Sequence, residues 1–385
     1  MVERKLRMGM VGGGGGFIGS VHRMAAMLDN EAVLVAGAFS SKPRKSLEWG
    51  AQFRLDPSRV YKDYKAMIEA EKKMPADRRL DWISIVVPNA MHFPIAKACL
   101  EAGFNVVCDK PMTTSLAEAK ELEKIVKKTK KVFVLTHNYT GYPMVKQARE
   151  FVRNGTLGKI NKIVAEYPQG WLSTLINAKA GGNALKMWRM DPKVAGGSCC
   201  MGDLGTHAAN LAYYITGLEM TELCADITAF VPGNKLEDDG NLLVHWQGGV
   251  KGLLYASQIQ AGEENTLRIH IYGDKMGLTW VQEDPNYLWL KDPVGTITRY
   301  SRGNDNLCDA AKGATRLPWG HPEGFIEAFA NVYREAFKAI RAEVAGEKIP
   351  EIDAPGVRDG IRGLSFIETI LKSAKSKEKW TKMVK

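Results

Sequence analysis

Short apolar runs alternate with amphipathic segments along the first 138 residues of the chain. The runs contain few polar residues, which is typical of strands buried on both faces of a parallel sheet. The segments between them repeat apolar residues three and four positions apart, which indicates helices. Strands separated by helices predict an α/β domain with a doubly wound parallel sheet and right-handed crossovers. The predicted strands are residues 7–11, 32–39, 82–88, 105–108 and 132–135, and the predicted helices begin at residues 17 and 43 and cover 61–72, 93–102 and 115–128.

The pattern changes after Tyr142-Pro143. A helix that ends at Gly155 is followed by short runs with strand character, separated by turn signals such as Gly248-Gly249. This arrangement predicts a second α/β domain with a large, mainly antiparallel open sheet. We expect the domains to cover residues 1–138 and 139–385. Two C-terminal helices, 325–340 and 358–373, are assigned to the second domain, with packing back onto the first as the alternative. The predicted strands are residues 162–167, 223–230, 242–246, 252–258, 267–272, 278–282, 287–291 and 296–300.

Five consecutive glycines, 12–16, lie between the first predicted strand and the first predicted helix. A strand, a glycine turn and a helix N-terminus together present main-chain N–H groups to a diphosphate. Gly14-x-Gly16-x-x-Gly19 fits the dinucleotide fingerprint, and so does Gly12-x-Gly14 with a two-residue insertion before Gly19. A glycine run also fits a flexible linker. A predicted strand precedes the glycines, and a predicted helix and a second strand follow them; this order favours the nucleotide loop.

The end of the second predicted strand bears on the choice of cofactor. An acidic residue there would bind the adenosine ribose and disfavour a 2′-phosphate. Ser40, Ser41 and Lys42 occupy this position instead. Hydroxyl groups and a cation admit NADP without excluding NAD, and an ordinary polar turn has the same composition.

Composition narrows the classes of partner. The net charge of +10 is spread along the chain, with modest clusters at 127–131 and 372–385, so we expect no nucleic-acid binding. No apolar stretch reaches the length of a membrane span, so we expect no membrane association. The six cysteines form no C-x-x-C pair or Cys/His cluster, which predicts no metal site and a cytoplasmic protein with reduced thiols.

Two further constellations could carry chemistry. Lys110 follows a predicted buried strand, where its ammonium could stabilise a developing alkoxide; a solvated surface lysine fits the spacing equally well. Asp203 and His207 are four residues apart and would share one face of a helix that begins near Asp203. A histidine oriented by a carboxylate can accept a proton near neutral pH. A capping aspartate beside a hydrogen-bonded core histidine is the equally consistent structural alternative.

Together these motifs resemble the Gfo/Idh/MocA oxidoreductases, named for glucose–fructose oxidoreductase and inositol dehydrogenase. The resemblance covers nearly the whole chain. It implies a Rossmann domain and an α/β domain whose open sheet often mediates homo-oligomer formation (dimer, tetramer or higher). Asp109 and Asn210 stand where many members carry Glu and Asp. The motifs are the glycine loop with His22, Pro88-Asn-Ala-Met-His92, the segment 101–111 ending in Asp109-Lys110-Pro111, Trp188-Arg-Met-Asp-Pro192 and Gly202-Asp-Leu-Gly-Thr-His207.

The resemblance implies roles for individual residues. Lys110, Asp203 and His207 match the catalytic lysine, aspartate and histidine of the family. The candidate substrate-binding residues are Tyr139, Tyr167, Trp171, Arg189, Asp203, His207 and His321. The candidate cofactor-binding residues are Gly12, Gly14, Gly15, Gly16, Phe17, Ile18, Ser40, Ser41, Lys42, Pro88, Asn89, His92, Asp109, Lys110, Asn138, Trp188 and Arg189.

The expected activity is an NAD(P)-dependent dehydrogenase that oxidises a secondary hydroxyl of a sugar or glycoside. The segment Gly320–Gly324 resembles a subgroup of sugar and glycoside dehydrogenases, and oxidation of a glucoside at C3 is the specific expectation. His207 would remove the hydroxyl proton and Lys110 would polarise the same oxygen. The alternatives are an inositol dehydrogenase, an NAD-dependent glycosidase of the same fold and a non-catalytic cofactor-bound regulator. The expected cofactor is NAD, with NADP admitted.

Overall fold

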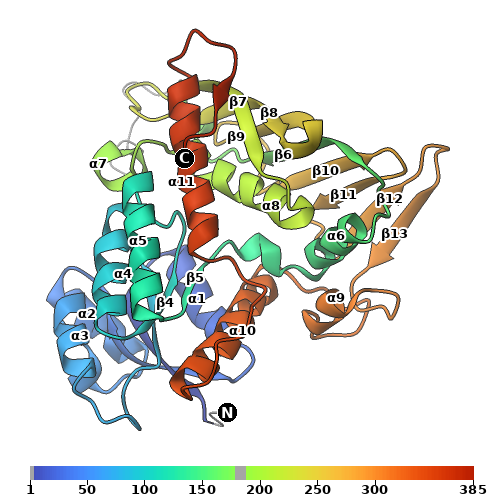
Figure 1. Ribbon diagram of the computed structural model, residues 1–385. Helices are drawn as coiled ribbons and strands as arrows, with labels where there is room; N and C mark the ends of the chain where they lie inside the picture. The colour runs from blue at the N-terminus through green and yellow to red at the C-terminus, as the bar shows by residue number, and fades with distance from the viewer. Residues whose placement is uncertain (1–3, 178–187) are drawn as a thin grey trace. The chain divides into compact units, whose positions relative to one another are not determined.

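The computed structural model describes residues 4–177 and 188–385, and these form two compact units (Figure 1). The first unit contains residues 4–138 together with Phe325–Ile361. The second contains the described residues of Tyr139–Gly324 together with Arg362–Lys385. The C-terminal helix α11 (Val357–Ser373) therefore includes the third boundary between the units, after Ile361.

Among the described residues, the first unit is built on a five-stranded parallel sheet with the order β2-β1-β3-β4-β5. The strand order reverses between β1 and β3, and in such sheets ligands bind at the carboxyl ends of the strands beside this point. The predicted doubly wound sheet is confirmed. Its strands are β1 (Leu6–Gly12), β2 (Ala32–Ala38), β3 (Trp82–Val86), β4 (Asn105–Cys108) and β5 (Phe133–Leu135), and the intervening helices are α1 (Phe17–Met27), α2 (Pro43–Gln52), α3 (Tyr64–Glu71), α4 (His92–Glu101) and α5 (Leu116–Thr129).

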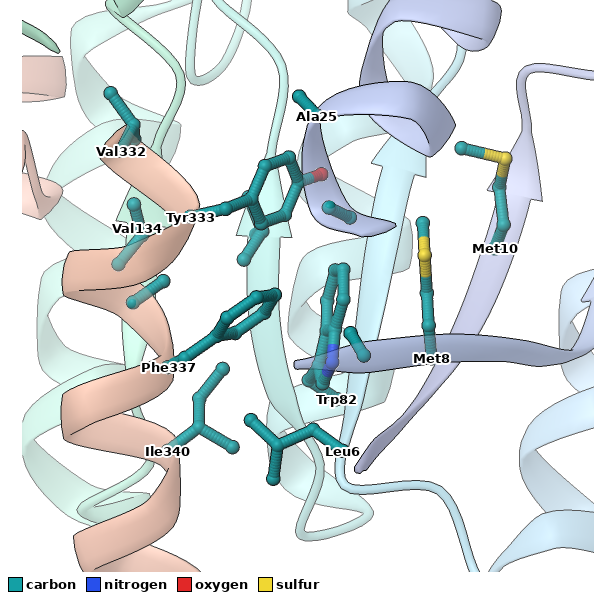
Figure 2. Packing of buried hydrophobic residues seen from close by; sticks show 14 of the residues in the cluster. Leu6, Met8, Met10, Ala25, Trp82, Val134, Val332, Tyr333, Phe337 and Ile340 are labelled. Atoms are coloured by element: carbon teal, nitrogen blue, oxygen red, sulfur yellow. The ribbon is translucent and has the colours of Figure 1, made fainter. Parts of the chain in front are cut away.

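The helix α10 (Phe325–Val344) belongs to the first unit and covers one face of its sheet. Figure 2 shows Tyr333 and Phe337 of α10 against Trp82 of β3, with ring centroids 5.3 and 5.7 Å from the indole. Trp82, Tyr333 and Leu6 have no measurable exposure to solvent. Burial of large aromatic side chains is a major source of stability, so α10 completes the core of a domain whose strands lie about 200 residues or more earlier in the sequence.

In the described part of the second unit, the sheet has nine strands in the order β13-β12-β11-β10-β6-β9-β8-β7-β14. Pairing is antiparallel except between β6 and β9, which confirms the predicted open, mainly antiparallel sheet. Strand β14 escaped prediction because two residues carry no periodicity. The strands are β6 (Ile160–Pro168), β7 (Met220–Thr228), β8 (Asp239–Trp246), β9 (Lys251–Ser257), β10 (Arg268–Gly273), β11 (Gly277–Val281), β12 (Tyr287–Lys291), β13 (Ile297–Ser301) and β14 (Thr381–Lys382).

The two faces of this sheet differ. Helices α6 (Pro143–Arg153) and α8 (Thr206–Thr216) pack on one face, together with buried side chains such as Leu242 and Leu254. The opposite face exposes Leu243 and its register partner Leu253, 42% and 41% accessible. In the described part of the unit, the other α-helices are α7 (Pro192–Ala195), α9 (Asp309–Gly313) and the later part of α11.

Two findings concern the expectations about membrane spans and cysteines. In residues 4–177 and 188–385, no helix combines the length and the apolar character needed to cross a membrane. All the cysteines lie in these ranges and are free thiols, and Cys99, Cys108, Cys199 and Cys200 are buried.

Candidate active site

The glycine loop that follows β1 takes conformations that require glycine. Gly12 and Gly16 have φ values of 75° and 83°, in the left-handed region. A Cβ atom on Gly12 would lie 2.1 Å from the carbonyl oxygen of Val86, and one on Gly19 would lie 2.2 Å from that of Gly13. A Cβ on Gly16 would meet open space. Gly12, Gly16 and Gly19 therefore match the three fingerprint glycines: the tight turn, the approach to the diphosphate and the helix–strand contact.

This assignment resolves the register left open by the sequence. The insertion lies between the first and second fingerprint glycines, and neither predicted register placed it there. Gly14 and Gly15 are the inserted residues that lie on the indole of Trp49. A Cβ on Gly14 would be 2.5 Å from Trp49 Cδ1, and one on Gly15 would be 3.2 Å from Cζ2. Trp49 in turn stacks on Phe53 with a centroid distance of 5.8 Å.

The N-terminus of α1 is suited to an anion. Gly16 provides no side-chain cap, and the first turn contains no acidic residue. The N–H groups of a first helical turn need acceptors, and the helix dipole favours a negative one. Phe17 is 71% exposed at this end, whereas Ile18 packs against the core. These residues fit the diphosphate of a dinucleotide.

The turn after β2 holds the other residues relevant to cofactor choice. Ser40 Oγ accepts a hydrogen bond from the Lys42 main-chain N–H at 3.1 Å. Ser41 and the Lys42 side chain are exposed. The turn is polar, carries a cation and has no acidic residue, so it accommodates an adenosine ribose with or without a phosphate.

Asp109 and Lys110 lie directly after β4. Asp109 Oδ1 accepts from the Lys110 main-chain N–H at 2.9 Å and from Thr136 Oγ1 at 3.0 Å. Burial opposes ionisation of Asp109, but the neighbouring His22, Lys110 and His92 outweigh it and hold the pKa of Asp109 well below its usual range. Asp109 is therefore a carboxylate at neutral pH, and it anchors the main chain of Lys110.

A group of buried, hydrogen-bonded polar side chains, His22, Tyr333 and Ser84, lies next to Asp109. His22 Nε2 lies 3.9 Å from Asp109 Oδ1, which is too far for a hydrogen bond. On the other side of the ring, His22 Nδ1 is 2.6 Å from the Tyr333 hydroxyl and 3.2 Å from Ser84 Oγ. A carboxylate disfavours a bare ring nitrogen, so the geometry favours the tautomer with the proton on Nε2 and hydroxyl donors at Nδ1.

His92, a predicted cofactor-binding residue, lies between two main-chain carbonyl oxygens. Its Nδ1 lies 2.6 Å from the Pro111 carbonyl oxygen and its Nε2 lies 2.8 Å from that of Val87. The side chain is 1% exposed. Both ring nitrogens thus face main-chain carbonyl oxygens, one in the loop after β3 and one in the loop after β4, and the ring lies between these loops. Contact of His92 with the cofactor stays a prediction.

Other predicted residues line the same sheet edge. Pro88 is exposed after β3, and the neighbouring Asn89 is 9% accessible. Asn138 Nδ2 is buried and has no hydrogen-bond partner among the described residues, so this N–H donor fits an acceptor oxygen of a bound cofactor. Burial and the Lys110 ammonium lower the pKa of His137 to about 3, so His137 is neutral at this edge.

In the second unit, Asp203 does not lie in an ordinary helix. It lies in a π-helical turn, Met201–Gly205, and His207 follows as the second residue of α8. The expectation of a regular helix beginning near Asp203 is therefore wrong in this detail; π-turns occur often at functional sites. Asp203 Oδ2 lies 3.5 Å from Arg189 Nε, and the Arg189 guanidinium lies 4.6 Å from the centre of the Trp188 ring.

The His207 ring packs among phenols. The Tyr139 ring lies edge-on to it at 4.8 Å, and the Tyr167 ring at 6.2 Å. The Tyr139 and Tyr167 hydroxyls are hydrogen-bonded to each other, and Tyr167 donates to Asn265 Oδ1 at 2.7 Å. Burial raises the pKa of Tyr139 to about 12 and that of Tyr167 well above its usual value, so both remain neutral. We call Tyr139, Tyr167, His207 and Asn265 the tyrosine–histidine cluster.

Sequence reasoning missed Asn265 and included two residues that lie apart from this cluster. Asn265 precedes β10 in a loop with no motif, so no local signal marked it. Trp171 is 39% exposed after β6, and His321 is exposed with Nδ1 3.3 Å from the Trp319 carbonyl oxygen. Among the described residues, neither makes a hydrogen bond, ion pair or ring contact with the cluster.

Comparison with known proteins places this chain among oxidoreductases. The model of the oxidoreductase family with an NAD-binding Rossmann fold matches residues 6–137, and that of the GFO/IDH/MocA C-terminal domain matches residues 145–279. An uncharacterized oxidoreductase of Bacillus subtilis (strain 168) is 33% identical over 389 residues, 99% of this chain and 97% of that protein.

Solved structures of oxidoreductases also resemble this chain over nearly its whole length. An oxidoreductase from Sinorhizobium meliloti has a TM-score of 0.88 and 42% identity, covering 98% of this chain and 99% of that one. An inositol dehydrogenase homologue from Azotobacter vinelandii, crystallised with NAD+, has a TM-score of 0.92 and 32% identity over 99% of this chain and 98% of its own. A complex of an inositol dehydrogenase homologue from that organism with NADH and myo-inositol has a TM-score of 0.89.

The contact between the inserted glycines and Trp49 predicts a coupling in cofactor binding. Gly14→Ala would place a methyl group 2.5 Å from the indole, so the loop must move, and we expect NADH to bind about 10-fold more weakly. In the Gly14→Ala/Trp49→Ala double variant the obstruction is gone, and binding should return to that of Trp49→Ala alone. NADH fluorescence titration of the four proteins measures the coupling.

Gly313→Ala is the matched control, because a Cβ there meets no atom within 4 Å. Wild-type NADH affinity in Gly14→Ala, or equal losses with and without Trp49, would show that this packing does not shape the loop.

Proposed function

The chain belongs to the Gfo/Idh/MocA family of NAD(P)-dependent oxidoreductases, and we propose that it oxidises a secondary ring hydroxyl of a cyclitol, sugar or glycoside. The tyrosine–histidine cluster is the observation that supports this most directly. It presents an imidazole framed by neutral phenols and an amide, beside the Asp203–Arg189 pair. Such a set of hydrogen-bonding groups and ring faces suits a compact polyhydroxylated ring.

The roles of the reacting groups are part of the proposal. His207 removes the substrate hydroxyl proton onto a ring nitrogen, and the Lys110 ammonium stabilises the negative charge that develops on the same oxygen. Asp203 supports the imidazolium by its charge. A dinucleotide held at the glycine loop would supply the hydride acceptor for this oxidation. The remaining contribution of the chain is positioning, since hydride transfer needs donor and acceptor carbons at about 3–3.5 Å.

The buried groups around these residues favour the assignment. Asp109 anchors the main chain of Lys110, and the phenols of Tyr139 and Tyr167 stay protonated near neutral pH. His207 is 7% exposed, so solvent competes little for its ring. Low solvent access strengthens the interaction of a charged imidazolium with a nearby carboxylate.

The first experiment is a spectrophotometric substrate screen with NAD and NADP. The panel contains myo-inositol, free pyranoses and glucosides, including those that would yield a 3-keto product. We expect reduction of the dinucleotide with at least one polyol, and the complex of the Azotobacter homologue with myo-inositol favours cyclitols. Hydrolysis without net NADH formation would indicate the NAD-dependent glycosidase instead. Tight cofactor binding with no turnover on any compound would indicate a regulator.

His207→Ala should lower kcat by about 100-fold or more, because a positioned proton acceptor contributes about 10²–10⁴-fold. NADH affinity should stay within about twofold of wild type, since the proposed role is confined to the substrate proton. Steady-state kinetics and NADH titration separate the two effects. His245→Ala is the control, because His245 pairs with Glu222 at 2.9 Å on another part of the sheet. Near-normal turnover of His207→Ala would remove His207 from this role.

We also propose that the chain forms a homo-oligomer through the exposed face of the nine-stranded sheet. Leu243 of β8 and its register partner Leu253 of β9 lie on this face, and Tyr272 of β10 lies on it beyond β6; each is about 40% exposed. Exposed apolar side chains across adjacent strands are costly in water and favour association. Sedimentation velocity should show an oligomer that Leu253→Glu dissociates, whereas a wild-type monomer at micromolar concentration would contradict the proposal.

A further inference from the structure

Glu237 is a buried carboxylate that holds the segment leading into the Asp203 turn. It lies just before β8 and is 6% exposed. Its Oε1 accepts from the main-chain N–H groups of Cys199 at 3.1 Å and Met201 at 3.0 Å, and also from the Ser198 hydroxyl. Its own main-chain carbonyl accepts from the Cys200 N–H at 3.1 Å. The side chain and the main chain of Glu237 thus accept hydrogen bonds from three consecutive main-chain N–H groups.

These contacts satisfy the start of the π-helical turn. The N–H groups at a helix start have no partner within the helix, and a local Ser, Thr, Asp or Asn usually supplies one. Here Ser198 Oγ accepts a hydrogen bond from the Gly202 N–H at 2.8 Å, and the Ser198 hydroxyl donates a hydrogen bond to Glu237. Cys200, at the N-cap position, forms no side-chain cap. The acceptor for the turn therefore comes from Glu237, just before β8 and about 35 residues further along the chain.

The turn also has little freedom to adjust on its other side. A Cβ on Gly240 of β8 would lie 2.5 Å from Met201 Sδ, and one on Gly205 would lie 2.7 Å from Met201 Cε. Met201 is fully buried between these glycines. The turn therefore packs tightly against β8, the strand that begins just after Glu237, and its position depends on that strand.

We propose that Glu237 is a positioning residue for Asp203 and His207, setting the start of the π-helical turn and so the orientation of both side chains. This inference rests on the proposed function. The role needs an acceptor oxygen rather than a negative charge, because the named donors converge on Oε1. Burial raises the pKa of Glu237 against the effect of these hydrogen bonds, which agrees with a demand for an acceptor.

Three variants test the inference, with catalysis measured on the substrate found in the screen. Glu237→Ala removes the acceptor and should lower kcat by about 100-fold, the loss expected from a displacement of about 1 Å at a reacting group. Glu237→Gln keeps an acceptor oxygen and should stay within about threefold of wild type. Ser198→Ala removes the acceptor for the Gly202 N–H and the hydroxyl donor to Glu237, but leaves the carboxylate and its bonds to Cys199 and Met201, and should cost about 10-fold. NADH affinity should change by less than about twofold in all three.

Asp238→Ala is the matched control. Asp238 is equally buried, and its carboxylate accepts from the Phe230 and Val231 N–H groups at 2.8 and 2.9 Å, in a loop separate from the turn. An equal loss of kcat in Asp238→Ala would show general loosening of the domain and overturn the inference. Wild-type kcat in Glu237→Ala or Ser198→Ala would overturn it as well, and Ser198→Ala decides the matter if Glu237→Ala fails to fold.

A second readout does not need turnover. In protein labelled with 15N-histidine, the His207 ring resonances should shift in Glu237→Ala and keep their wild-type positions in Glu237→Gln and Asp238→Ala. If no substrate in the panel is oxidised but the His207 resonances follow this pattern, the proposed function fails while the positioning role stands. Unchanged His207 resonances in Glu237→Ala would refute the positioning role whatever the activity.

Discussion

Main-chain polar groups at the ends of buried strands and helices need hydrogen-bond partners, and the functional edges of this protein depend on buried side chains that supply them. His92 lies between the carbonyl oxygens of Val87 and Pro111 and joins the loops that follow β3 and β4. Glu237 takes up the amides that precede Asp203. In both cases the side chain comes from a different element than the loop that it holds. The loops gain a defined position without a regular structure of their own.

Burial also separates the groups that can exchange protons from those that only shape the site. The pKa of His137 lies at about 3 and those of Tyr139 and Tyr167 lie above the physiological range, because the buried charged forms are disfavoured. Asp109 is held as a carboxylate by its neighbours despite burial. Each of these groups keeps one protonation state near neutral pH. In the proposed mechanism the substrate proton goes to His207 rather than to any of these groups.

The glycines of the loop after β1 are required for different steric reasons. Gly12 and Gly19 are required by close main-chain contacts, and Gly16 by its positive φ value. Gly14 and Gly15 have another reason to be glycine, since they rest on Trp49 of α2. A run of identical residues thus answers several separate steric demands.

The local sequence determined the secondary structure and the fold class of this protein, because hydrophobic periodicity and turn residues act over a few positions. It also indicated Lys110, Asp203 and His207, since their motifs are short and contiguous. Only the tertiary structure decided the register of the glycine loop, the π-helical turn at Asp203 and the packing of α10 on Trp82. The same holds for Asn265 and Glu237, whose partners lie about 35 or more residues away. Contacts between distant residues leave no periodic trace in the sequence, because the fold alone brings them within reach.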